Sequence, residues 1–167
     1  MDEFERELQW TLQWEGKFID DVDDPGGATN YGITQKNYDI WRTTNGLKPR
    51  SVRDIQQSEV INIYREWYWD AKYAPPLRMV MFDTAVNFGQ AGSIYMLQEA
   101  LGVKADGFVG RITSNALRQS NLKQTARTVI ILRKLFRYER CTKNPSQKKF
   151  LQGWLNRDNA LLKWLDA

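Results

Sequence analysis

Residues 14–34 read WEGKFIDDVDDPGGATNYGIT, and no other stretch of the 167-residue chain is as informative about fold and chemistry. Glu15 comes first, followed by an Asp-rich loop with Pro25-Gly26-Gly27 and then by the polar pair Thr29 and Asn30. Neither a helix nor a strand requires this composition, and clustered carboxylates repel one another. The stretch therefore predicts a loop that is kept for its chemistry.

Helical patterns surround this loop on both sides. Phe4, Leu8 and Leu12 recur at helical spacing and predict a helix over 2–15, which Gly16 ends. The prolines and glycines of residues 17–34 exclude a regular helix there and predict a short β-hairpin or an ordered loop. Further helices are expected over 35–44, 51–69, 111–119 and 125–140, as a pair between 77 and 101 separated at 89–92, and from 150 to 165. The chain is expected to be mainly α.

The composition limits the possible chemistry. The sequence has no histidine, which excludes histidine acid–base catalysis, Ser-His triads and most zinc sites. The single Cys141 excludes an intramolecular disulfide. The longest aliphatic run, Val129 to Leu132, is far too short to span a bilayer, so no stable membrane insertion is expected. Carboxylates must carry any acid–base step.

Charge is distributed unevenly along the chain. Residues 1–40 hold ten acids and three bases, a net of −7, so with +4 overall residues 41–167 carry +11. A basic body suggests a polyanionic partner such as nucleic acid, an anionic membrane surface or a bacterial cell wall. The bases considered for such binding are Arg127, Arg133, Lys134, Arg137 and Arg140. The alternative is that they are solvated side chains on helix surfaces.

Two carboxylates of the loop suggest glycoside cleavage, which uses one carboxylic acid and a second, ionised carboxylate. Glu15, flanked by Trp14 and Phe18, can be partly desolvated, which favours its neutral, proton-donating form. Asp24 stands directly before Pro-Gly-Gly, where a sharp turn can point its side chain inward, and Thr29 or Asn30 could orient it or hold a water. Alternatively, Asp24 and Thr29 only satisfy turn backbone groups.

A calcium-binding loop is an alternative interpretation of the same acids. An EF-hand that begins at Asp21 would place Pro25 at its fifth position and Gly32 at its twelfth, where an acid is required. The pattern fails, and neither a metal site nor a cofactor is expected.

The motifs resemble a known family along nearly the whole chain. The run WEGKF…DDPGGATNYGIT resembles the N-terminal signature of glycoside hydrolase family 108, a lysozyme-like group of N-acetylmuramidases common in phage endolysins. The segments FDTAVNFGQ, LQEALG, DGFVGRIT and FLQGWLNR, which begin at Phe82, Leu97, Asp106 and Phe150, resemble the predicted peptidoglycan-binding module that accompanies that family.

The resemblance implies roles for individual residues. Glu15 corresponds to the catalytic glutamate, although Gly16-Lys17 replaces the usual Gly-Gly. Asp24 follows Glu15 after eight residues, as in phage-type lysozymes, but only four residues separate Asp24 from Thr29, where those enzymes have five. Thr29 and Asn30 therefore remain alternatives. The substrate-binding candidates are Asn30, Tyr31, Asp83 and Asn87, the last two being four residues apart on one helical face that borders the cleft in lysozyme-like folds.

These observations predict a lysozyme-like, mainly α fold with a short β-hairpin or ordered loop beside the catalytic glutamate. A catalytic region over 1–76 and a helical peptidoglycan-binding region over 77–167 are expected to pack as one compact unit. The expected activity is that of a bacteriolytic, antimicrobial hydrolase that cleaves the β-1,4 bond between N-acetylmuramic acid and N-acetylglucosamine.

The expected setting is a phage or prophage endolysin that acts as a monomer on peptidoglycan. It would stay in the host cytoplasm until release and then reach the periplasm or cell wall. The alternatives are a lytic transglycosylase and a non-catalytic wall-binding protein. A nucleic-acid partner is not expected, because the chain has an acidic N-terminal loop and no recognition motif.

Overall fold

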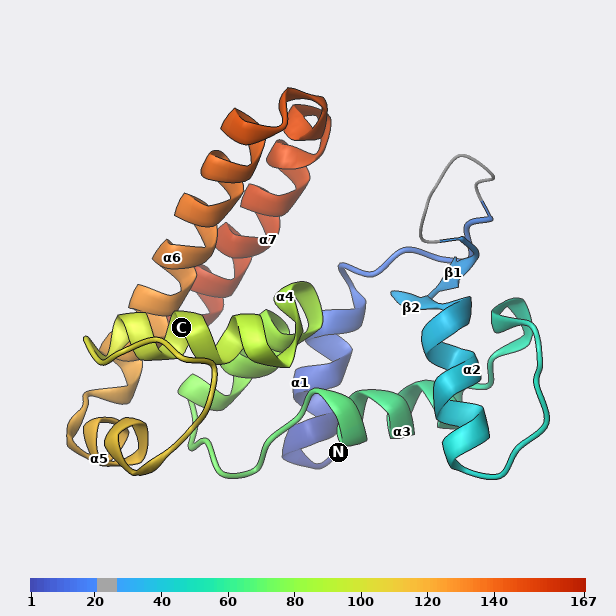
Figure 1. Ribbon diagram of the computed structural model, residues 1–167, viewed down its shortest axis with the longest axis horizontal. Coiled ribbons are helices and arrows are strands. Elements are labelled where there is room, and N and C mark those ends of the chain that lie inside the picture. The colour runs from blue at the N-terminus through green and yellow to red at the C-terminus, as the bar shows by residue number, and fades with distance from the viewer. Residues whose placement is uncertain (21–26) are drawn as a thin grey trace. The chain divides into compact units, whose positions relative to one another are not determined.

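The computed structural model describes residues 1–20 and 27–167, which form two compact units, residues 1–67 (the N-terminal unit) and 68–167 (the C-terminal unit). Elements of the N-terminal unit are α1 (Glu3–Leu12), β1 (Thr29–Asn30), β2 (Ile33–Thr34), α2 (Gln35–Thr44), the 3-10 helix η1 (Val52–Asp54) and α3 (Gln57–Trp67). Those of the C-terminal unit are α4 (Leu77–Ala100), α5 (Arg111–Gln119), α6 (Leu122–Lys143), the 3-10 helix η2 (Pro145–Gln147) and α7 (Lys148–Asp166) (Figure 1). The predicted mainly α class, with a β-hairpin after Glu15, is confirmed.

The N-terminal unit is built on the contact between α1 and α3. Phe4 and Leu8 of α1 and Val60 and Ile63 of α3 are all buried. Asp2 caps α1 by accepting a hydrogen bond from the Glu5 backbone N–H at 2.7 Å. A short antiparallel sheet of β1 and β2 leads directly into α2 (Figure 1).

Two predicted helices of this unit differ from the observed ones. The first helix ends at Leu12, so Glu15 lies in a bend beyond the helix instead of at its last residue. The helix expected over 51–69 is divided, because Ser51 caps only the short η1 and the backbone becomes extended at Ile55 (ψ 132°) before α3 begins. The capping motif at Ser51 predicted the start of a helix, but it gave no sign that the chain becomes extended at Ile55.

In the C-terminal unit α6 packs between α4 and α7, and α6 and α7 lie side by side as antiparallel neighbours (Figure 1). The helix pair expected on either side of 89–92 is one element, α4, interrupted at Gly89 (φ 75°, ψ 166°). This left-handed φ favours glycine, which explains the interruption. The two units divide between Trp67 and Tyr68, whereas the sequence placed its boundary at 76/77, the start of α4.

A buried network of charged side chains joins α4, α6 and α7. Asp83 of α4 accepts from Arg157 Nη2 at 2.6 Å and lies 2.8 Å from Arg133 Nη2. Asp158 of α7 lies 2.7 Å from Arg133 Nη2 and accepts from Arg137 Nε at 2.7 Å. Arg133 meets both carboxylates as an ion pair, at angles outside those of hydrogen bonds. The network thus connects three helices through groups that carry full charges.

This network corrects the view of the bases as wall-binding residues. Arg133 is fully buried and Arg137 is 5% exposed, so neither is available to a polymer outside the protein. Phe88 lies against both guanidinium groups, with its ring centroid 5.6 Å from Arg133 and 4.9 Å from Arg137. Part of the basic charge therefore stabilises the core.

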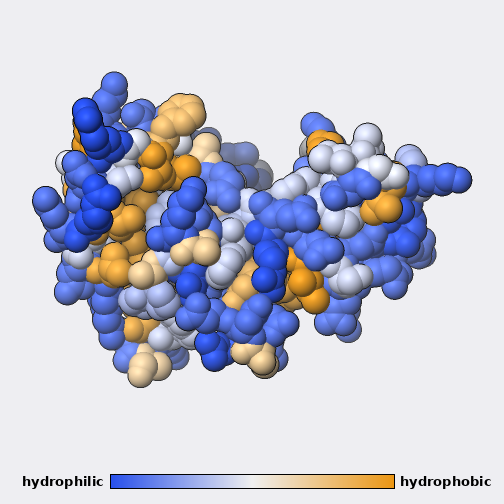
Figure 2. Space-filling view, turned by 90° about the horizontal axis from the view of Figure 1, so that it is seen from below, coloured by the Kyte–Doolittle hydropathy of each residue, from blue (hydrophilic) through white to orange (hydrophobic). Residues whose placement is uncertain are grey.

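The surface still presents apolar side chains. Hydrophobic residues appear among hydrophilic ones on the face shown in Figure 2. The exposed large hydrophobic residues of the molecule include Tyr95, Leu135, Phe136 and Phe150. Among the described residues, none of the helices has the length and apolar character needed to cross a membrane.

We expect Asp83→Asn to destabilise the C-terminal unit by about 3–5 kcal/mol, because removing one partner leaves buried charge uncompensated. Burial raises the pKa of Asp83, but the charges of Arg133 and Arg157, together with the hydrogen bonds from Arg157, outweigh it and hold this pKa below its ordinary value. The stabilisation is therefore complete above the unfolded pKa of about 3.9 and is lost as the pH falls through the lower folded pKa. Urea unfolding at pH 7 and pH 3 measures this.

The control is Asp166→Asn, which removes an exposed carboxylate paired with Arg127 and should change stability by less than about 0.5 kcal/mol. An Asp83→Asn deficit of the same size at both pH values would contradict the ionic explanation.

Candidate active site

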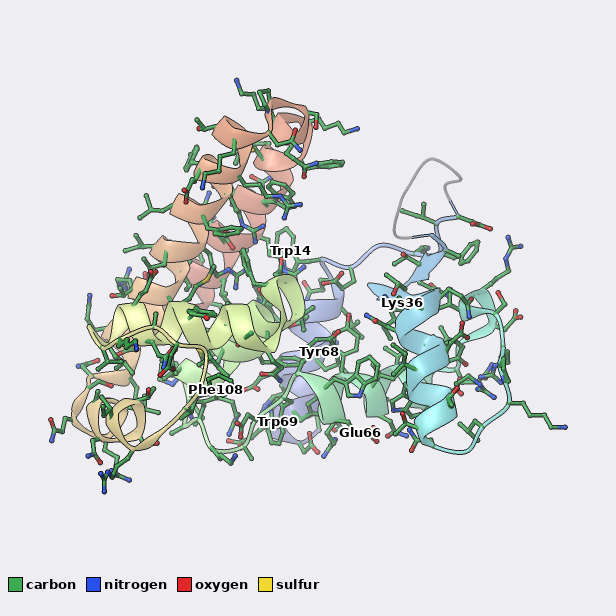
Figure 3. The ribbon with its side chains drawn as sticks, viewed as in Figure 1. Trp14, Lys36, Glu66, Tyr68, Trp69 and Phe108 are labelled. Atoms are coloured by element: carbon green, nitrogen blue, oxygen red, sulfur yellow. The ribbon has the colours of Figure 1, made fainter. Side chains whose placement is uncertain are left out.

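Glu15 lies just beyond α1 in a tightened turn. The Trp14 N–H donates to the Thr11 carbonyl at 3.1 Å, and the Glu15 N–H donates to the Leu12 carbonyl at 3.3 Å. These two hydrogen bonds form one irregular turn after the end of α1. Trp14 lies past the C-terminal end of α1 in Figure 3, with its ring 5.9 Å from that of Trp10. This turn leaves the Glu15 side chain half-buried.

The β-hairpin turns through two left-handed residues. Asn30 pairs with Ile33 across the hairpin, so Tyr31 and Gly32 form the two-residue connection. Their φ angles are 50° and 73°, the pattern of a type I′ turn, which matches the natural twist of paired strands. The Tyr64 hydroxyl of α3 donates to the Tyr31 carbonyl at 2.8 Å and fixes the turn to the helix behind it.

The carboxylate of Glu15 lies against this turn at Gly32. A Cβ atom added to Gly32 would be 2.5 Å from Glu15 Oε2 and 2.9 Å from the Tyr64 hydroxyl oxygen. The glycine is thus required twice, for its positive φ and for the close approach of the two side chains. Gly32 brings an acid and a phenol to the same point beside the hairpin.

The acid-rich loop begins and ends on the same hairpin. Ile19 and Thr29 exchange backbone hydrogen bonds of 2.8 Å in both directions, which closes the segment between them. Phe18 lies under the Arg53 guanidinium at 4.4 Å. Asp24, the predicted second carboxylate, falls in residues 21–26 and therefore lies outside the described residues.

Thr29 and Asn30 differ in what they contact. The Thr29 hydroxyl donates to the Gly27 carbonyl at 3.2 Å and lies at the base of the loop. Asn30 is 7% exposed, and its amide nitrogen donates to the carbonyls of Val52 and Arg53, both at 3.2 Å. Asn30 thereby holds β1 to η1, whereas the neighbouring Tyr31 is 42% exposed.

Asp83 is not a substrate-facing residue as predicted, whereas the assignment of the half-buried Asn87 stays a prediction. Asp83 has no exposed surface and is committed to Arg133 and Arg157. The Asn87 amide donates to the Asp83 carbonyl at 2.9 Å, and its oxygen accepts from Arg137 Nη2 at 3.3 Å. The two residues thus contact the ionic core from one helical face, with Asp83 fully buried and Asn87 half-buried.

A second ionic network stabilises the chain between α2 and α3. Glu59 of α3 pairs with Arg42 of α2 and with Arg50, and Tyr38 donates to Glu59 at 2.7 Å. Burial raises the pKa of Glu59, but the Gln56 N–H, the Tyr38 hydroxyl and the two arginines outweigh it, so this pKa lies below its usual value. The ionised carboxylate anchors the segment to which Asn30 is bound.

Sequence reasoning missed Gly32 as a contact of Glu15 and missed Tyr64 altogether. The signal at Gly32 was present, because a glycine after an aromatic residue between two short β segments suggests a turn. Tyr64 had no comparable signal, since it lies within a helix and reaches the site only through tertiary packing. Among the described residues, no group of three or more His, Cys, Asp or Glu side chains could hold a metal ion.

The chain is similar to known proteins along most of its length. Residues 8–89 match the family described as Glycosyl hydrolase 108, and residues 92–159 match the one described as Predicted Peptidoglycan domain. Solved structures also match, among them one described as "Structure of Brucella abortus SagA". That structure is 26% identical, with a TM-score of 0.81, over 97% of this chain and 92% of its own. No curated protein matches the chain.

We expect Gly32→Ala to lower hydrolysis of cell walls about 10²-fold, because the new methyl group must displace Glu15 and a shift of about 1 Å in a reacting group can cost that much. The matched control is Gly46→Ala, which also replaces a glycine of positive φ (68°) but has nothing within 4 Å of the added carbon.

Turbidity clearing per folded molecule separates the two variants, with thermal unfolding to correct for lost stability. Both variants should lose about 1 kcal/mol through backbone strain, and only Gly32→Ala should lose activity. Equal activity in both would show that the contact with Gly32 does not position Glu15.

Proposed function

Because the chain belongs to glycosyl hydrolase family 108, we propose that it hydrolyses the β-1,4 bond between N-acetylmuramic acid and N-acetylglucosamine, with Glu15 as the general acid. The chain is a glycoside hydrolase, and its second family match supports peptidoglycan as its substrate or partner. The observation that carries the proposal is the half-buried Glu15 carboxylate, held against the Gly32 turn beside the Tyr64 hydroxyl.

Glu15 would donate its proton to the glycosidic oxygen as the bond to the anomeric carbon breaks. The transition state resembles an oxocarbenium ion, so a proton delivered to the leaving oxygen lowers the barrier. The fixed turn supports this role, since both of its left-handed residues and the Tyr64 hydrogen bond restrict where the carboxylate can lie. Tyr31, exposed on the same turn, is the residue that we propose contacts the sugar.

Asp24 would position the attacking water or stabilise the positive charge on the sugar. The paired Ile19 and Thr29 support this, because they return the acid-rich loop to the strand next to the Gly32 turn. Of the two polar helpers, Thr29 is favoured, since the Asn30 amide nitrogen already donates to two backbone carbonyls.

The biological setting that we propose is host lysis by a phage or prophage endolysin acting as a monomer. Release from the host cytoplasm would bring the enzyme to the periplasm or cell wall. The resemblance of the catalytic motif to a group common in phage endolysins supports this setting, and lysis timing in a deletion of the gene would test it.

We expect Glu15→Gln to abolish wall lysis with the fold intact, because glutamine keeps the shape but has no proton to give, and loss of a general acid costs about 10²–10⁴-fold. Zymography on embedded cell walls and turbidity clearing measure the loss. Glu3→Gln is the control, since Glu3 is an exposed glutamate in the first turn of α1 and its change removes the same charge. Near wild-type lysis by a folded Glu15→Gln protein would refute the assignment.

The products should carry reducing N-acetylmuramic acid ends, one for each bond cut. A hydrolase transfers water to the anomeric carbon, whereas a lytic transglycosylase lets the sugar's own 6-hydroxyl attack and leaves a 1,6-anhydro end. Mass spectrometry of the released muropeptides distinguishes these ends by the mass of one water. Mostly anhydro ends would reject the water-activating role of Asp24, and reducing N-acetylglucosamine ends would assign a different bond.

A further inference from the structure

The C-terminal unit has a groove of about 420 Å³ between the second half of α4 and α6. Phe88 and Tyr95 line it from α4, and Leu132 and Phe136 line it from α6. Phe88 and Phe136 meet edge to face at 5.5 Å, which makes one end of the groove rigid. Tyr95 and Phe136 remain 45% and 44% exposed, so the groove presents unpartnered aromatic surface. Its size suits a small ligand or a short peptide.

Two carboxylates line this groove in a unit that is strongly basic. Residues 68–167 contain sixteen bases and seven acids, a net of +9. Five of the acids are used elsewhere in the unit: Asp70 and Asp106 accept backbone hydrogen bonds, Asp166 pairs with Arg127, and Asp83 and Asp158 are buried in the ionic core. The other two, Glu99 and Glu139, both line the groove. The groove therefore holds two of the seven acids of this unit, and one of them, Glu139, pairs with Lys143.

Cations lie directly beside these carboxylates. A smaller hollow shares Phe136 and Glu139 with the groove and adds Arg140 and Lys143. Lys143 pairs with Glu139 at 2.6 Å, with both side chains more than half exposed, so the pair is weak and a ligand can replace either partner. Apolar, negative and positive groups therefore lie next to one another on this surface. This pattern suits a ligand that carries both an ammonium and a carboxylate.

We propose that this groove binds the peptide stem of peptidoglycan, with the side-chain ammonium of its diamino acid between Glu99 and Glu139. The stem's alanine methyl groups would contact Tyr95 and Phe136, and its carboxylates would meet Arg140 and Lys143. The inference rests on peptidoglycan being the substrate. Except for Phe88, these residues lie within 92–159, the segment matched as a predicted peptidoglycan domain.

The charges favour the peptide over other occupants. A neutral glycan strand would stack on the aromatic rings but gives no reason for two carboxylates. A second copy of a unit of charge +9 would bring mostly cations to a surface that already holds Arg140 and Lys143, and like charges repel. The stem peptide alone combines small apolar groups with charges of both signs.

The test measures binding of the synthetic peptide L-Ala–γ-D-Glu–L-Lys–D-Ala to the full-length chain, by calorimetry and by NMR titration. The same peptide with an acetylated lysine ammonium is the paired probe. Wild-type protein should bind the free-ammonium form about tenfold more tightly, as expected for a charge-assisted hydrogen bond. In the double variant Glu99→Gln, Glu139→Gln this preference should fall to about one, and Asp166→Asn, an exposed acid outside the groove, should retain it.

Glu99 and Glu139 are both exposed, so the double variant should fold normally, and thermal unfolding checks this. Its activity on peptide-free glycan strands should match wild type, while hydrolysis of intact peptidoglycan should weaken. Equal affinity of wild-type protein for both peptides, or no saturable binding, would overturn the proposal. So would a concentration-dependent dimer that the double variant abolishes. Because peptide binding requires no turnover, its failure is distinguishable from failure of the catalytic assignment to Glu15.

Discussion

The close approach of Glu15 to Gly32 is the constraint on which the candidate active site depends. A side chain at position 32 would occupy the space taken by the carboxylate and by the Tyr64 hydroxyl. The same residue needs a positive φ to complete the two-residue turn with Tyr31. Because Gly32 has no Cβ atom, it can adopt the positive φ of the turn and also leave room for the Glu15 side chain. If Glu15 is the general acid that we propose, this contact holds the acid in place before substrate arrives, which removes a cost from the transition state.

Charge serves different purposes in the two units. In the N-terminal unit, ionised Glu59 with its two arginines holds the segment that supports β1. In the C-terminal unit, Asp83 and Asp158 neutralise arginines in the interior, where the geometry must be good because desolvation is costly. Glu99 and Glu139 are exposed, with Arg140 and Lys143 beside Glu139, so these charges can meet a charged polymer. The net charge of the whole chain reveals none of these separate roles of its charged residues.

The sequence predicted much of the fold, and it proposed Glu15 as the catalytic acid. Hydrophobic spacing, with Gly and Pro as breaks, located α2 and α5 at their observed bounds and the interruption of α4 at Gly89. Asp83 was misjudged because helical spacing shows which residues share a face with it, but not whether its side chain meets solvent or a buried arginine. The same limit applied to Arg133 and Arg137, whose charges are compensated by residues far along the chain.

The sequence by itself therefore determined a mainly α chain without histidine, in which a carboxylate had to supply the acid and Glu15 was the best-placed one. These conclusions depend on residue type and local spacing, which the sequence contains in full. Only the tertiary structure decided that Tyr64 reaches the Gly32 turn, that Asn30 holds β1 to η1, and that the arginines at 133 and 137 are internal. Each of these contacts joins residues that are distant in the chain. Such contacts arise from tertiary packing, which the spacing of residues along a short segment does not reveal.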